Sequence, residues 1–137
     1  MSAAYEKLKF YQDICDIRRL VQKITARFPA SQFRLTSQIR DAARSAKQNI
    51  REGYKKGTAN EFMRSIMISR GSLEELGGDI EDCWEDGLIT EDECEHLKRL
   101  IRSVDFLSVR YLRALTVMKK AGTWKAPSFY RGGEKTL

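Results

Sequence analysis

Residues 35–53 read Leu-Thr-Ser-Gln-Ile-Arg-Asp-Ala-Ala-Arg-Ser-Ala-Lys-Gln-Asn-Ile-Arg-Glu-Gly and carry two overlaid helical patterns. One is an apolar stripe at helical spacing, which consists of Leu35, Ile39, Ala42, Ala46 and Ile50. The other is a basic row on a second side of the same helix, which consists of Arg40, Arg44, Lys47 and Arg51. We expect the stripe to be buried, the row to face outward, and Gly53 to end the helix in a left-handed conformation. The two patterns predict a helix bundle and suggest a polyanionic partner.

Length and composition favour a single domain in an intracellular setting. A chain of 137 residues can bury about two thirds of its unfolded surface without a disulfide or a metal. Its two prolines, Pro29 and Pro127, bracket a long stretch that favours long helices. No apolar run is long enough for a membrane span, and the N-terminus lacks the apolar core of a signal peptide. We therefore expect a cytoplasmic protein with reduced cysteines, in which Cys15 and Cys83 belong to the core and Cys94 is a third free thiol.

The formal net charge of +6 is distributed unevenly. Between Glu74 and Glu95 there are eleven acidic residues and no basic one, whereas residues 31–60 carry seven basic and two acidic residues. The molecule is therefore expected to be strongly dipolar rather than uniformly basic.

Four apolar stripes advance in steps of three and four residues, and each stripe predicts one helix. The predicted helices cover about residues 5–27, 35–52, 58–86 and 90–120. Thr58 with Glu61, and Thr90 with Glu93, have the spacing of capping boxes. Because the links are short, neighbouring helices must be antiparallel. We expect an all-α, up-down-up-down antiparallel four-helix bundle over residues 1–121, followed by a flexible basic and aromatic tail over residues 122–137.

Apolar side chains that lie off these stripes predict self-association, because contiguous exposed apolar surface usually marks an interface. The residues concerned are Met63, Met67, Phe106, Val109 and Leu112. We expect a homo-oligomer.

The string Gln38-Ile39-Arg40-Asp41-Ala42-Ala43-Arg44-Ser45, followed by Asn49-Ile50 and Glu52-Gly53, resembles a known signature. It is that of the four-helix bundle proteins encoded in intervening sequences of large-subunit ribosomal RNA genes. Phe28-Pro29, Glu61-Phe62 and residues 69–76 also match, and the resemblance covers about residues 8–118. It implies a ring-like homo-oligomer, often a pentamer, without catalytic activity. A related branch, the accessory variability determinant of diversity-generating retroelements, implies a basic ring that binds a reverse transcriptase and nucleic acid.

Catalytic and metal chemistry is not expected. Glu93-Cys94-Glu95-His96 contains the Glu-x-x-His spacing of di-iron bundles, but His96 is the single histidine, so the required second motif does not exist. The same shortage argues against a zinc site. No phosphate-cradling glycine loop or nucleophile–base set is visible. We expect no enzyme activity, no metal and no cofactor.

Two hypotheses for function remain. In the first, the protein binds RNA or an RNA–DNA hybrid as an accessory to a nucleic-acid enzyme. The candidate phosphate contacts are Arg40, Arg44, Lys47, Arg51, Lys55, Lys56, Lys125 and Arg131, and the candidate base-stacking residues are Trp124, Phe129 and Tyr130. In the second, the protein is an interaction scaffold, in which the basic row and the acidic segment dock subunits or a partner.

Two further interpretations concern polar residues. The basic row could instead pair with Glu74 or Glu75 of the third helix, or serve only as a solvated surface. Asn49, Glu52 and Ser72 are expected to form a structural polar cluster, because buried polar groups need partners.

Overall fold

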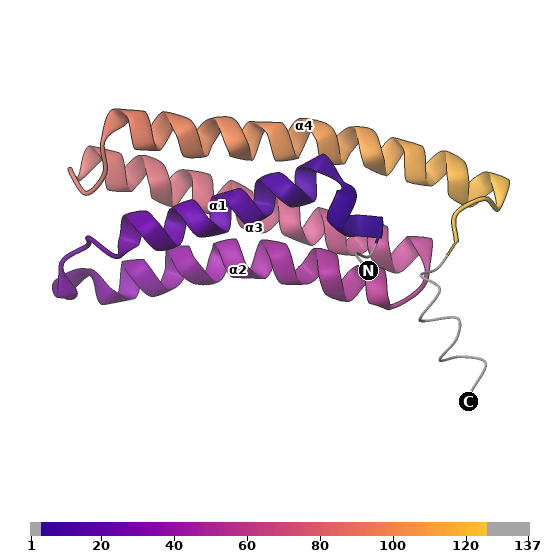
Figure 1. Cartoon of the computed structure of the whole chain (residues 1–137), viewed down its shortest axis with the longest axis horizontal. Helices are drawn as coiled ribbons and strands as arrows, with labels where there is room; N and C mark the ends of the chain where they lie inside the picture. The colour runs from indigo at the N-terminus through magenta and orange to yellow at the C-terminus, as the bar shows by residue number, and fades with distance from the viewer. Residues whose placement is uncertain (1–3, 126–137) are drawn as a thin grey trace.

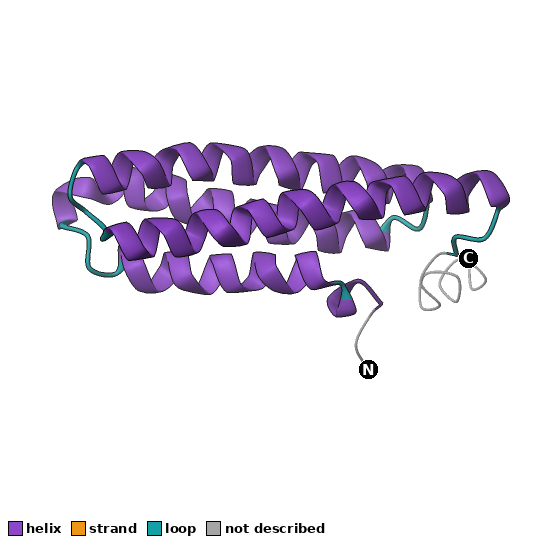
Figure 2. Ribbon diagram, turned by 90° about the horizontal axis from the view of Figure 1, so that it is seen from above, coloured by secondary structure: helices purple, strands orange, loops and turns teal. Residues whose placement is uncertain are grey.

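A computed structural model describes residues 4–125. The elements are a short 3-10 helix η1 (Ala4–Lys7), α1 (Lys9–Thr25), η2 (Ala30–Gln32), α2 (Phe33–Lys55), α3 (Ala59–Glu85) and α4 (Glu91–Ala121). The four α-helices run alternately up and down, with the α1–α2 and α3–α4 links at one end (Figure 1). Each helix packs on two neighbours, in the cyclic order α1, α2, α3, α4 (Figure 2). The prediction of an all-helical, antiparallel four-helix bundle is confirmed.

The predicted end of the second helix is wrong. Gly53 lies inside α2 and is buried, and the helix continues to Lys55. The residue with the left-handed conformation is Gly57, with φ of +86°. Gly53 is needed for a different reason, because it faces Ser65 of α3 too closely for any side chain. The glycine at position 53 therefore marks a close contact between two helices and not the end of a helix.

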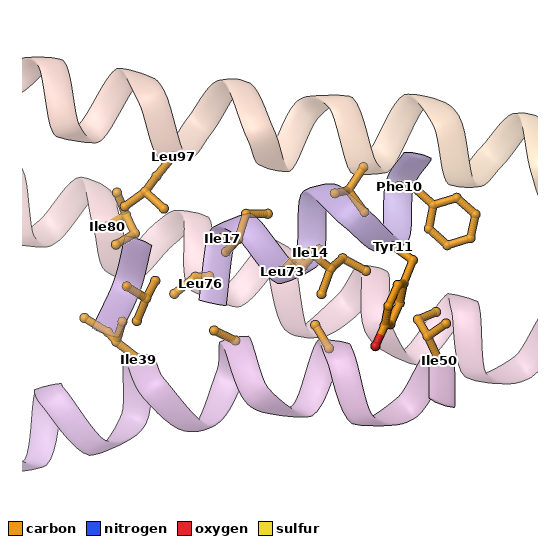
Figure 3. Packing of buried hydrophobic residues seen from close by; sticks show 14 of the residues in the cluster. Phe10, Tyr11, Ile14, Ile17, Ile39, Ile50, Leu73, Leu76, Ile80 and Leu97 are labelled. Carbon is orange, nitrogen blue, oxygen red and sulfur yellow. The ribbon is translucent and has the colours of Figure 1, made fainter. Parts of the chain in front are cut away.

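The core consists of apolar side chains from all four helices, which point toward the bundle axis (Figure 3). Among the fully buried residues are Ile14, Ile17, Ile39, Ile50, Leu73, Leu76, Ile80 and Leu97. In α2 the phase differs slightly from the prediction, since Ala43 is buried while Ala42 is half-buried. The small Ala46 lets α3 approach closely enough for Ser69 Oγ to donate a hydrogen bond to the Ala46 carbonyl at 2.7 Å.

An aromatic cluster closes the end of the bundle where α2 meets α3. The centroids of neighbouring rings in this cluster lie 5.0 to 6.4 Å apart. Its members are Tyr5, Phe10, Tyr11, Tyr54, Phe62, Tyr111 and Trp124. Gly122, with φ of +71°, turns the chain after α4 so that the Trp124 ring lies 6.4 Å from the rings of Tyr54 and Phe62. The first residues of the predicted tail therefore pack on the bundle.

The helix caps and cysteines agree only in part with expectation. Thr90 and Glu93 form the reciprocal capping box of α4, whereas the Thr58 hydroxyl accepts a hydrogen bond from the Glu61 amide alone. Cys83 is buried as predicted, but Cys15 is only half-buried. Cys94, which was not assigned to the core, is buried because it begins the inward face of α4. None of the helices in the described part has the length and apolar character to span a membrane.

Candidate nucleic-acid interface

The basic row of α2 faces α1 at both of its ends. Arg40 Nε donates a hydrogen bond to Thr25 Oγ1 at 2.8 Å. The Arg51 guanidinium lies close enough to the Tyr11 hydroxyl for this group to raise the pKa of Arg51, and the Tyr11 side chain reaches from α1 toward α2 (Figure 3). Arg44 is exposed between these anchored ends. The expected outward orientation is thus right for Arg44 and wrong for Arg40 and Arg51, because the α1 side chains offer polar acceptors to their guanidinium groups.

A matching row on α1 lies alongside. It consists of Tyr11, Cys15, Arg18, Gln22 and Thr25, spaced by 4, 3, 4 and 3 residues. Since its two ends contact Arg51 and Arg40 of α2, the rows run side by side along what we call the α1–α2 face. Arg18, at the middle of the α1 row, adds a cation to the centre of this face. Sequence reasoning did not assign it, because only the packing of α1 beside α2 brings Arg18 next to the basic row.

Several cations of the α1–α2 face have no acidic partner within the described residues. Arg18, Arg44 and Lys47 form no ion pair there. The alternative in which Glu74 or Glu75 neutralises the row is not realised either, because both carboxylates are exposed on α3 and form no ion pair in the described chain. The positive charge of this face is therefore available to an anion from outside.

Arg51 is held in place by tyrosines. Burial raises the pKa of Tyr11 to about 12, so its hydroxyl stays protonated at neutral pH. The hydrogen bond to Tyr11 raises the pKa of Arg51, and the Tyr5 hydroxyl contributes to the same effect. A guanidinium has five N–H donors, so two tyrosine oxygens leave donors free for a phosphate. Arg51 can therefore anchor η1 and α1 and still take part in anion binding.

The other predicted phosphate contacts gather near the aromatic end. Lys55 is half-buried at the end of α2, and Lys56 Nζ lies 3.6 Å from the Glu61 carboxylate. Lys125 is exposed next to Trp124, whose ring packs against the aromatic cluster. The candidates Phe129, Tyr130 and Arg131 lie outside the described residues. Because Lys55 follows Arg51 by four residues in α2, it continues the basic row toward the aromatic end.

The expected polar cluster forms around a residue that was not predicted. Asn49 Nδ2 donates to the Ser45 carbonyl at 2.8 Å and to Ser45 Oγ at 3.2 Å. Ser45 Oγ lies 3.4 Å from Ser72 Oγ of α3. Glu52 is exposed and takes no part in these contacts. The cluster holds α2 against α3, so its role is structural.

The opposite side of the bundle, formed by α3 and α4, is different in chemistry. A hollow of about 480 Å³ lies between these helices. Leu73, Ile101 and Val104 are among its apolar lining, and the Arg70–Asp105 ion pair at 2.7 Å borders it. Exposed apolar side chains lie on the same helices, as expected for two of the off-stripe residues, Met67 (55% exposed) and Phe106 (62%). The other three, Met63, Val109 and Leu112, are half-buried.

Within residues 4–125 no group of three or more histidine, cysteine, aspartate or glutamate side chains is arranged to hold a metal ion. Comparison with protein families matches residues 6–108 to the family described as 23S rRNA-intervening sequence protein. This match confirms the resemblance that the sequence showed around residues 38–53. A search of curated proteins found no match to the chain.

Proposed function

We propose that this chain, which belongs to the 23S rRNA-intervening sequence protein family, is a non-catalytic protein that binds RNA or an RNA–DNA hybrid through its α1–α2 face. In this proposal it acts in the cytoplasm as an accessory to a nucleic-acid enzyme such as a reverse transcriptase. The enzyme partner is suggested by the resemblance to the retroelement branch.

One observation carries the proposal of nucleic-acid binding. Arg18 and the basic row place five cations on a single face, and none of the five forms an ion pair within the described residues. From Arg40 to Arg51 the row extends for about 16 Å, which is long enough to follow several phosphates. A face of this kind binds phosphates largely without regard to base sequence.

The test separates charge from structure. Arg44→Gln with Lys47→Gln removes two cations without removing an observed contact to α1. We expect weaker binding of RNA and a log-affinity against log-salt slope that is smaller in magnitude by about 1.4 to 1.8. Arg99→Gln with Arg113→Gln is the matched control, because both arginines are exposed on α4 and form no ion pair in the described chain. Equal losses in the two double variants would show that only net charge matters.

Self-association is the second part of the proposal, and we expect a pentamer. The exposed Met67 and Phe106 on α3 and α4 support an interface on that side of the bundle. Sedimentation equilibrium of the wild type is expected to give a multiple of the 15.8 kDa chain. Met67→Lys with Phe106→Lys is expected to lower the assembled mass. A 15.8 kDa wild-type species at micromolar concentration contradicts this part.

The alternative is a scaffold that binds no nucleic acid, and the same apolar residues favour it. The scaffold hypothesis predicts that Met67→Lys with Phe106→Lys abolishes assembly or partner binding. It also predicts that the wild type does not bind RNA at moderate salt. The accessory role predicts instead that a reverse transcriptase binds the wild type together with RNA.

A further inference from the structure

An exposed aromatic residue continues the basic row beyond Arg40. Phe33, the first residue of α2, lies seven residues before Arg40, about two helical turns, so both side chains lie on one side of the helix. The Phe33 side chain is 64% exposed, and the Arg34 guanidinium carbon lies 5.9 Å from its ring centroid. We propose that the α1–α2 face binds single-stranded nucleic acid, with Phe33 stacking on an unpaired base beyond the Arg40 end of the row.

This inference rests on the proposed function and names the class of nucleic acid. Sites for single strands combine a track of cations for the backbone with an aromatic side chain on which a base stacks. The row supplies the track, and Phe33 supplies the ring at its end. In a duplex the bases are already paired and stacked on one another, so a ring on the protein surface finds no free base on which to stack.

The position of Phe33 among the aromatic residues supports this role. The other aromatic side chains of η1, α1 and α2 are all buried and belong to the aromatic cluster; they are Tyr5, Phe10, Tyr11 and Tyr54. The exposed Trp84 and Phe106 lie on α3 and α4, away from the basic row. Phe33 is thus the one exposed aromatic side chain on the two described helices that carry the cations.

The length of the site also fits. From Phe33 to Arg51 the helix rises by about 27 Å, which is compatible with binding sites of about 4 to 16 nucleotides. The acidic segment from Glu74 to Glu95 belongs to α3, α4 and their link, which lies at the same end of the bundle as Phe33, where Asp79 accepts a hydrogen bond from Gln38 and Glu93 pairs with Arg27. The two acidic residues of α2, Asp41 and Glu52, each follow a residue of the row by one position, so each is displaced from it by about 100° around the helix.

The test replaces the ring and keeps apolar bulk. Wild type and Phe33→Leu are titrated with an oligouridine of about 12 nucleotides and with the same strand in a duplex with oligoadenine. We expect Phe33→Leu to bind the single strand about tenfold more weakly, because the stacking of one base is lost. Its affinity for the duplex is expected to equal that of the wild type. Phe33→Trp is expected to restore single-strand affinity, since the indole offers a larger face.

The matched control is Trp84→Leu. Trp84 is an aromatic side chain on α3 that is 43% exposed and lies away from the basic row. We expect Trp84→Leu to bind both oligonucleotides as the wild type does, with sizing by light scattering to show that all variants assemble alike.

The outcomes distinguish two kinds of failure. If the wild type binds neither oligonucleotide, the proposed function itself is wrong. If the wild type binds both with salt-dependent affinity while Phe33→Leu is unchanged, the function stands and the stacking role of Phe33 is overturned. Equal losses for Phe33→Leu and Trp84→Leu, or equal losses on single strand and duplex, overturn it as well.

Discussion

Gly53 of α2 and Ser65 of α3 are in direct contact, and the contact leaves no space for a side chain at position 53. A Cβ placed on Gly53 would lie 1.9 Å from Ser65 Oγ and 2.2 Å from Ser65 Cβ. Both residues are buried, and Ser65 Oγ donates a hydrogen bond to the Glu61 carbonyl at 2.9 Å. The missing side chain of Gly53 therefore sets how closely α2 and α3 approach near the aromatic end.

Gly53→Ala is expected to destabilise the bundle, although alanine is the better helix former. The added methyl group must push α2 and α3 apart, and overpacking of this kind costs about 1 to 3 kcal/mol. Urea denaturation followed by circular dichroism measures the change. Gly53→Ala combined with Ser65→Gly is expected to recover part of the loss, since it removes the clashing atoms. A stabilised single variant would show that Gly53 is a helix defect instead.

Ile50→Asp and Arg51→Glu are expected to differ sharply, although the residues are adjacent. Ile50 is fully buried, so an unpaired carboxylate there costs several kcal/mol and is expected to unfold the bundle. Arg51 lies at the half-buried edge of α2, and its replacement removes contacts with Tyr11 and Tyr5 but leaves the core intact. Thermal melts of the two variants give the comparison. Equal losses of thermal stability in the two variants would mean that the buried and outward positions of α2 are wrongly assigned.

Glu93 is expected to make the bundle sensitive to acid. Its carboxylate accepts two hydrogen bonds from Arg27 Nη2, at 2.8 and 2.7 Å, and one from the Thr90 amide. Chiefly through Arg27, these hold the pKa of Glu93 below its ordinary value of 4.5. Because the folded-state pKa is lowered, this stabilisation is present above pH 4.5 and is lost as the pH falls through the folded-state pKa.

Glu93→Gln is therefore expected to cost about 0.5 to 1 kcal/mol at neutral pH and progressively less in acid. Denaturant titrations across the acid range measure the difference from the wild type. Glu95→Gln is the control, because Glu95 is exposed and its carboxylate lies 3.9 Å from Arg102 Nη2. A Glu93→Gln deficit that does not change with pH would assign the effect to cap geometry alone.

Trp124→Ala is expected to lower stability and leave nucleic-acid binding unchanged. The Trp124 ring packs against Tyr54 and Phe62, so its loss removes aromatic contacts worth about 1 to 2 kcal/mol. Thermal denaturation and RNA titration of the same preparation test both statements. Trp84→Ala, at an exposed site on α3, serves as the control for stability. Weaker RNA binding without a change in stability would return Trp124 to the list of base contacts.

Sequence reasoning found the basic row because four cations at helical spacing are visible without a structure. It could not find that Arg40 and Arg51 contact α1, because that depends on which helix packs beside α2. Arg18 was missed for the same reason, since a single arginine on α1 has no partner until the two rows lie side by side. Phe33 was missed because the second helix was predicted to begin at Leu35, two residues too late.

The sequence was enough to determine four antiparallel helices, through its apolar stripes, its caps and its short links. A stripe with a period of 3.6 residues and the length of a link are both properties of a short stretch of chain, so they can be read without the tertiary structure. Contacts between segments distant in sequence were decided only by the tertiary structure. Whether a glycine ends a helix or lets another helix approach depends on what faces it, and Gly53 faces Ser65 across the bundle. Trp124 likewise lies beyond the last helix in sequence, and only the closing of the bundle places it on Tyr54 and Phe62.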